Sequence, residues 1–362
     1  MGILRLLLAL SVVAAHCGAI WGFTLVGGQI AVQSFYIISG FYMTLILNEK
    51  YIGINNSYQL FISNRFIRLY PIYWTVLITT ILVCFIIAIS SNFKNIPFAF
   101  YFSQTNYFSF GFLTLTNLII FGQDVVMFLG INPANGNLFF TKNFLSTNPQ
   151  LYTFLLIPQA WTLGVELMFY LVAPFIVKRG IKTVITIIIV SLVLRFILYD
   201  YFILKDDPWT YRFFPTEILF FLCGYLSYHL YQKIKKVTFP KHLNISVLLF
   251  CIGITILYKY LPTGKVSFLP FSLKEGVYFG TIILSIPILF NYSKKNPLDN
   301  KIGELSYPVY ISHMLIFMIL SLKTFNFLNS GWIAALFTIL FSYVLNVLIA
   351  SPIEKLRQRR LK

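Results

Sequence analysis

Four polar residues lie inside stretches that are otherwise apolar, and they are the side chains best suited to chemistry. His16, Glu166, Arg195 and His313 each occur within a run of about 20 mostly hydrophobic residues. Ionisable groups in such runs are costly to bury, so they suggest a functional site with partners nearby. The two histidines could act as general acid or base near neutral pH. A single such histidine is often only a packing residue, and the group as a whole favours a site.

The first hydrophobic stretch, Met1 to Phe23, carries Arg5 and, after ten intervening residues, His16. On one helix this spacing separates the two side chains by roughly 16 Å along the axis. If the helix spans a bilayer, Arg5 lies near one face and His16 near the midplane. A cleavable signal peptide has similar features, but the single basic residue and His16 before Cys17 favour a retained helix.

A second basic group follows in FISNRFIRLYPIYW, where Arg65 and Arg68 are three residues apart and therefore share one helix face. Together with Arg5 they predict a cationic mouth on the cytoplasmic side, suited to binding phosphates. The same arginines would also satisfy the positive-inside rule without any function. A phosphorylated donor at this mouth could thread its reactive end toward His16.

The composition predicts the kind of secondary structure that carries these residues. Hydrophobic residues make up 58% of the chain and charged residues 11%, and the mean hydropathy is +0.79. These values predict an all-α, polytopic transmembrane bundle rather than a barrel, which would alternate over short strands. We expect about ten spans, near residues 3–22, 29–48, 68–90, 154–177, 182–203, 213–231, 243–261, 276–293, 303–321 and 331–350.

The net charge of +17 comes from basic clusters between alternate spans, which places both termini in the cytoplasm and argues against nucleic-acid binding. We expect a single integral membrane domain over 1–352 and a basic cytoplasmic tail over 353–362. Residues 91–153 form a long outer segment that is an interfacial element, a re-entrant element or two short helices. Its NPANGN sequence at 132–137 indicates a turn.

Other ionisable residues receive less specific predictions. Arg195 could neutralise a carboxylate, with Glu166 as the candidate. Glu217 and Arg212 are expected at the outer rim, and His229 and His242 are expected to be structural or solvated. The four cysteines are dispersed in apolar stretches, so no metal site and no disulfide framework is predicted.

Five segments in this order resemble the acyltransferase-3 family of membrane O-acyltransferases, whose members acylate cell-surface carbohydrates. They are the pair Arg5 and His16, AVQSFYIISGFYM (31–43), Arg65 and Arg68 before LYPIYW, WTLGVELMFYL (161–171) and LSYPVYISHMLI (305–316). Two positions depart from the family pattern. Gln33 stands where many members have an acidic residue, and Thr162 replaces a common serine.

The resemblance implies an acyl-CoA donor, with acetyl-CoA expected, and a sugar hydroxyl of a surface polysaccharide, lipopolysaccharide or lipid-linked saccharide as acceptor. Arg5, Arg65 and Arg68 would bind the donor, and His16 would deprotonate the hydroxyl or transiently accept the acyl group. Glu166 would orient His16. Gln33, Ser39, Tyr170, Arg195 and His313 are further candidates for acceptor contact or support. The protein would reside in the cell inner (plasma) membrane.

Two other classes of function remain open on the sequence. A transporter or flippase of a lipid-linked saccharide could use the same His, Glu and Arg residues as a proton relay. It would tolerate loss of Arg65 and Arg68 better than an enzyme that binds coenzyme A. A purely structural membrane subunit is the third class, which the polar residues within the spans disfavour.

Overall fold

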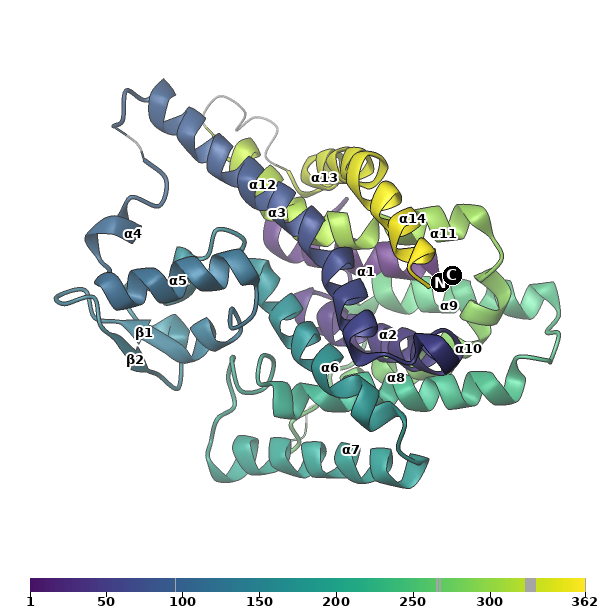
Figure 1. Ribbon diagram of the computed structural model, residues 1–362. Helices are drawn as coiled ribbons and strands as arrows, with labels where there is room; N and C mark the ends of the chain where they lie inside the picture. Colours follow the sequence, from purple (N-terminus) through teal and green to yellow (C-terminus); the bar gives the residue numbers. More distant parts are fainter. Residues whose placement is uncertain (95, 265, 267, 323–329, 362) are drawn as a thin grey trace.

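Apolar runs form the long helices of a bundle, as hydropathy predicts (Figure 1). The structure is a computed structural model that describes residues 1–94, 96–264, 266, 268–322 and 330–361. The bundle contains α1 (Gly2–Cys17), α2 (Gly28–Glu49), α3 (Tyr58–Ser90), α6 (Trp161–Val177), α7 (Ile181–Phe196), α8 (Phe214–Ile234), α9 (Lys241–Ile256), α10 (Leu273–Ser293), α11 (Pro297–Glu304), α12 (Ser306–Leu320), α13 (Gly331–Leu345) and α14 (Ser351–Arg359). The predicted all-α, polytopic membrane class is confirmed.

Each predicted span coincides with a helix, although the helices differ in length. Within the described residues, seven helical segments are long and apolar enough to cross a bilayer: Gly28–Glu49, Tyr58–Ser90, Pro158–Val177, Ile181–Tyr201, Leu273–Ser293, Pro297–Leu320 and Gly331–Arg359. The predicted span at 213–231 corresponds to α8, which has 21 residues but is not among these seven. The helices α1 and α9 have 16 residues each. They therefore reach only about 24 Å, less than a hydrocarbon core of about 30 Å.

The first helix is shorter than its predicted span of 3–22, because it ends at Cys17. Gly18 follows with φ 97°, a left-handed conformation that suits glycine and ends the helix. A Cβ on Gly331, the first residue of α13, would lie 2.0 Å from the Gly18 carbonyl oxygen, so the two segments touch backbone to backbone. His16 consequently lies in the last turn of α1 rather than at the middle of a full span.

The outer segment is built around α5 (Tyr107–Ile119), with the one-turn α4 (Phe100–Ser103) before it. The strands β1 (Leu129–Ile131) and β2 (Leu138–Phe140) pair antiparallel, and residues 132–137 form the turn between them, as the NPANGN sequence predicts. These elements stand together at the left side of the bundle in Figure 1. The segment thus contains two short helices, one of the alternatives expected for it, together with a hairpin of which only the turn was predicted.

Aromatic residues of α3 attach this outer unit to the bundle. The last carbonyls of a helix have no partner within the helix. Here Tyr70 and Tyr73 donate their hydroxyls to the carbonyls of Ile119 and Asn117, and the Trp74 indole N–H donates to the Leu118 carbonyl at 2.9 Å. The LYPIYW motif therefore caps the C-terminus of α5.

Both chain ends meet at one end of the bundle, where N and C lie side by side in Figure 1. The Met1 amino group forms an ion pair with Asp299 of α11 at 2.8 Å. The Asn55 amide, just before α3, donates to the Leu361 carbonyl at 3.0 Å. This agrees with the prediction that both termini are on the same side of the membrane.

The helices α2 and α8 approach each other closely at two glycines. A Cβ on Gly40 would lie 1.8 Å from the Phe221 carbonyl oxygen, and one on Gly224 would lie 2.0 Å from the Ile37 carbonyl oxygen. Small residues of this kind let helix backbones approach closely in membranes. Gly40 therefore has a packing role, whereas Ser39 beside it faces a cavity.

Gly40→Ala is expected to destabilise the protein by at least about 1–3 kcal/mol, because the added methyl group collides with backbone atoms that can move only if the helices separate. Thermal unfolding of the purified protein in detergent measures this loss. Gly111→Ala in α5 is the matched control, since a Cβ there meets no atom within 4 Å. Equal melting temperatures for Gly40→Ala and the wild type would show that this contact is not tight.

Candidate functional site

The two intramembrane histidines form a pair. His16 Nδ1 and His313 Nε2 are 2.9 Å apart, and the ring planes differ by only 5°. His313 is completely buried at 0% exposure, whereas His16, in the last turn of α1, is exposed. We expected Glu166 to orient His16, but the hydrogen-bond partner that the structure gives to His16 is His313.

The hydrogen bonds assign the protons on this pair. His313 Nδ1 lies 2.6 Å from the Tyr310 carbonyl oxygen, which can only accept, so His313 Nδ1 carries the proton. In neutral His313 the Nε2 atom is then an acceptor, and His16 Nδ1–H must donate to it. His16 Nε2 is left with a free lone pair. The pair thus holds the more exposed histidine as a base with a defined tautomer.

Glu166 belongs to a second polar group, which faces the interior of the bundle. Its Oε1 atom accepts hydrogen bonds from the Ser39 hydroxyl at 2.6 Å and from the Tyr170 hydroxyl. Tyr170 lies one helical turn after Glu166 on α6, which explains why the two meet. Both donors use the same carboxylate oxygen, so Oε2 is available to a ligand in the adjoining cavity.

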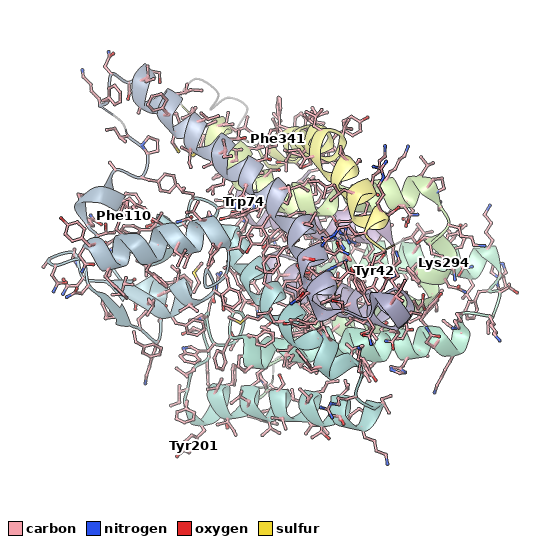
Figure 2. All side chains as sticks on the ribbon, in the orientation of Figure 1. Tyr42, Trp74, Phe110, Tyr201, Lys294 and Phe341 are labelled. Carbon is pink, nitrogen blue, oxygen red and sulfur yellow. The ribbon has the colours of Figure 1, made fainter. Side chains whose placement is uncertain are left out.

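That cavity has a volume of about 100 Å³ and lies between α1, α2, α3, α6 and α12. It adjoins a larger cavity of about 440 Å³ at the end of the bundle where the termini meet. Five residues line both: Arg5, Tyr42, Met43, Arg68 and Tyr307. Figure 2 shows Tyr42 among the helices and Lys294, which lines the larger cavity, nearer that end.

Three arginines predicted to bind a donor gather around these cavities. Arg5 and Arg68 line both cavities, and Arg65 lines the larger one. The ion pairs of the described residues involve none of them. Arg65 is only 3% exposed, and its Nε atom has no hydrogen-bond partner. Arg5 and Arg65 contact the rings of Tyr42 and Phe61, but buried cations without a counter-ion are unfavourable, so this arrangement suits a ligand that brings negative charge.

Arg195, Glu217 and Gln33 form a third polar group, and the predictions for Arg195 and Glu217 were wrong. Arg195 of α7 forms its ion pair with Glu217 of α8 rather than with Glu166, and it also donates to the Thr210 and Thr216 carbonyls. Glu217 is 0% exposed, so it is a buried residue and not a rim residue. The Gln33 amide donates to both Glu217 oxygens, at 3.3 and 3.1 Å. An acidic residue at position 33 would repel the Glu217 carboxylate. This repulsion explains why position 33 is a glutamine in this chain.

The remaining predictions can be placed as well. Arg212 is half-buried, pairs with Asp207 at 2.7 Å and stacks on Trp161. His229 packs against Tyr225, and His242 is exposed at the start of α9. Among the residues that the structure describes, no group of three His, Cys, Asp or Glu side chains is placed to hold a metal ion.

Sequence reasoning missed the tyrosines that connect the groups. Tyr310 lines the smaller cavity, its ring centroid lies 6.0 Å from that of His313, and its hydroxyl receives a hydrogen bond from Thr162. Phe35 packs on Tyr310 at the same end. The spacing of Tyr307, Tyr310 and His313 at intervals of three was the available signal, because it places them close together on α12.

Comparison with known proteins extends this description. A family model for the acyltransferase-3 type, described as an acyltransferase domain, matches residues 1–351. A protein of Aquifex aeolicus (strain VF5), described as uncharacterized, is 27% identical over 210 residues, covering 56% of this chain and 89% of that protein. No solved structure matches this chain. The family match includes all three polar groups and ends at the first residue of α14.

Proposed function

Because the chain belongs to the acyltransferase-3 family and is a multi-pass membrane acyltransferase, we propose that it moves an acetyl group from cytoplasmic acetyl-CoA to a hydroxyl of a carbohydrate. The acceptor is a cell-surface polysaccharide or a lipid-linked saccharide, and the membrane is the inner (plasma) membrane. Family membership favours this enzyme over the transporter and the structural subunit. The supporting observation is the pair of joined cavities, which leads from unpaired arginines toward the histidine pair.

The donor nucleotide occupies the larger cavity in this proposal. Its volume of about 440 Å³ lies within the range of roughly 300–1,000 Å³ that is typical of ligand sites. The phosphates of coenzyme A supply the negative charge that Arg5, Arg65 and Arg68 lack. Guanidinium groups bind phosphate through charge-assisted hydrogen bonds with planar geometry.

The pantetheine arm continues into the smaller cavity, where Glu166 Oε2 accepts a hydrogen bond from an amide N–H of the arm. Glu166 is therefore proposed to position the donor rather than to orient His16. Ser39 and Tyr170 hold the carboxylate in place through Oε1. The thioester end of the arm extends past Phe35 and Tyr310, which line the smaller cavity, to the histidine pair that Tyr310 contacts.

The free lone pair on His16 Nε2 accepts the proton of the acceptor hydroxyl. The acceptor hydroxyl approaches from the exposed side of His16 and attacks the thioester carbonyl while its proton moves to Nε2. The C–S bond breaks, and the proton passes to the departing thiolate, which leaves as free coenzyme A. A covalent acyl-histidine intermediate uses the same lone pair. In both routes His313 and the Tyr310 carbonyl hold the ring in the reactive tautomer.

The test of this function is the O-acetyl content of the host's surface glycans, measured by NMR before and after mild base. Wild-type cells, cells with the gene deleted and complemented cells are compared. We expect an ester signal that is lost on deletion and restored on complementation. An unchanged ester content together with reduced glycan export would contradict the enzyme and support the carrier.

Arg68→Gln and Arg65→Gln are expected to weaken acetyl-CoA binding roughly tenfold or more, because each removes a charge-assisted hydrogen bond worth about 1.5–3 kcal/mol. Binding to purified protein in detergent is measured by calorimetry. Arg179→Gln is the matched control, since Arg179 is exposed in the loop after α6. If all three variants bind the donor like the wild type, the larger cavity is not its site.

A further inference from the structure

The C-terminal helix forms one wall of the larger cavity. The chain leaves α13 through a π-helical turn, Asn346–Ala350, and α14 then packs back against α3. The Arg360 guanidinium, just after α14, donates to the Asn64 side chain and to the Ser63 hydroxyl, each at 2.9 Å. These bonds fix the end of the chain to the same helix that carries Arg65 and Arg68.

A fourth guanidinium enters the cavity from this helix. Arg357 lines the larger cavity, is only 7% exposed and forms an ion pair with Glu354 through Nη1. Its Nε atom is buried without a hydrogen-bond partner, as is that of Arg65. A buried N–H without an acceptor is costly. Arg65 and Arg357 both line this cavity, and their other guanidinium N–H groups suit a ligand that supplies acceptor oxygens.

The charges on the wall indicate an anionic ligand. The lining includes the Met1 amino group, six cationic side chains, Arg5, Lys50, Arg65, Arg68, Lys294 and Arg357, and three carboxylates, Asp299, Glu304 and Glu354. Asp299 is already paired with the Met1 amino group, and Glu354 with Arg357. The positive charge that remains is distributed along the cavity rather than concentrated at one point.

The arginines occupy different positions along the two cavities. Arg5 and Arg68 lie where the two cavities join, whereas Arg65 and Arg357 line the larger cavity alone. In coenzyme A the diphosphate follows the pantetheine arm directly, and the ribose 3′-phosphate comes after it. An arm in the smaller cavity therefore brings the diphosphate to Arg5 and Arg68, and the 3′-phosphate to the region of Arg65 and Arg357.

We infer that α14 is part of the donor site and that Arg357, together with Arg65, binds the 3′-phosphate of coenzyme A. This inference rests on the proposed function, because it needs coenzyme A as the donor. Arg357 lies beyond residues 1–351, the part of the chain that the family model matches. The residue thus gives the protein a means of distinguishing coenzyme A from its 3′-dephospho form.

The experiment compares the affinities of coenzyme A and 3′-dephospho-coenzyme A for the full-length purified protein by calorimetry. The wild type is expected to bind coenzyme A about tenfold or more tightly than the dephospho form. Arg357→Gln is expected to lose most of this preference while binding the dephospho form as the wild type does. Arg359→Gln, on the exposed side of α14, is the control and should keep the preference.

Unchanged binding of the dephospho form also shows that Arg357→Gln is folded. Arg357→Lys retains the charge, provides a second variant and should keep part of the preference. A full preference in Arg357→Gln, or an equal loss of affinity for both ligands, would overturn the assignment while leaving coenzyme A as the donor. Failure of the wild type to bind either ligand would instead overturn the proposed donor and the inference with it.

Discussion

His16→Ala is expected to lower the rate of acyl transfer by about 10²- to 10⁴-fold, the usual contribution of a positioned general base. Donor affinity should remain unchanged, because His16 lines neither of the two cavities. The variant removes the lone pair that the contact with His313 presents to the acceptor. The measurement is coenzyme A release with acceptor glycan, using protein reconstituted in lipid.

His242→Ala is the matched control for this experiment, since His242 is exposed at the start of α9. His313→Ala is the companion variant. It should reduce the rate less than His16→Ala and should also alter its pH profile, because His16 loses the partner that holds its tautomer. A wild-type rate in His16→Ala at equal protein level would exclude His16 as the base.

Glu217→Ala is expected to destabilise the protein by about 3–5 kcal/mol, because it leaves the buried Arg195 guanidinium without its counter-charge. Both side chains of this pair are almost completely buried. Removing one partner of such a pair is far more harmful than replacing both. The free energy of unfolding, measured by adding sodium dodecyl sulfate to mixed micelles, reports the loss.

The double variant Arg195→Met, Glu217→Gln removes both charges and is expected to recover much of the lost stability. Asp200→Ala is the matched control, because Asp200 is an exposed carboxylate just beyond α7. A loss below about 1 kcal/mol in Glu217→Ala, the usual value for exposed ion pairs, would show that the pair is not essential to the bundle. Acyl transfer should then be tested separately, since Gln33 links the pair to α2.

Local patterns in the sequence predicted much of the architecture. A bilayer requires about 20 apolar residues per helix, so each hydropathy peak identified a helix before any packing was known. Arg65 and Arg68 were correctly placed on one helix, α3, because a separation of three residues always gives a shared face. The helix ends were less predictable. The first span was drawn too long because Gly18, which ends α1, occurs within an apolar run.

The hydrogen-bond and ion-pair partners of residues on different helices could not be predicted in this way. Hydropathy gives the depth of a residue along its own helix but neither the order of the helices nor their rotation. Glu166 was therefore a reasonable partner for both His16 and Arg195, and it is the hydrogen-bond partner of neither. His16 meets His313, 297 positions away in the chain, and Arg195 meets Glu217.

Composition and residue spacing predict a helical membrane protein with cations at one end and histidines within its spans, because both act through the bilayer and the single helix. Which polar groups meet depends on the packing of the helices. In the folded bundle His313 lies within hydrogen-bond distance of His16, and Glu166 accepts hydrogen bonds from Ser39 and Tyr170. Arg357, near the end of the chain, lines the same cavity as Arg65. These contacts depend on how the helices pack against one another. Close packing such as that at Gly40 and Gly224 forms only when the helices are assembled into the bundle.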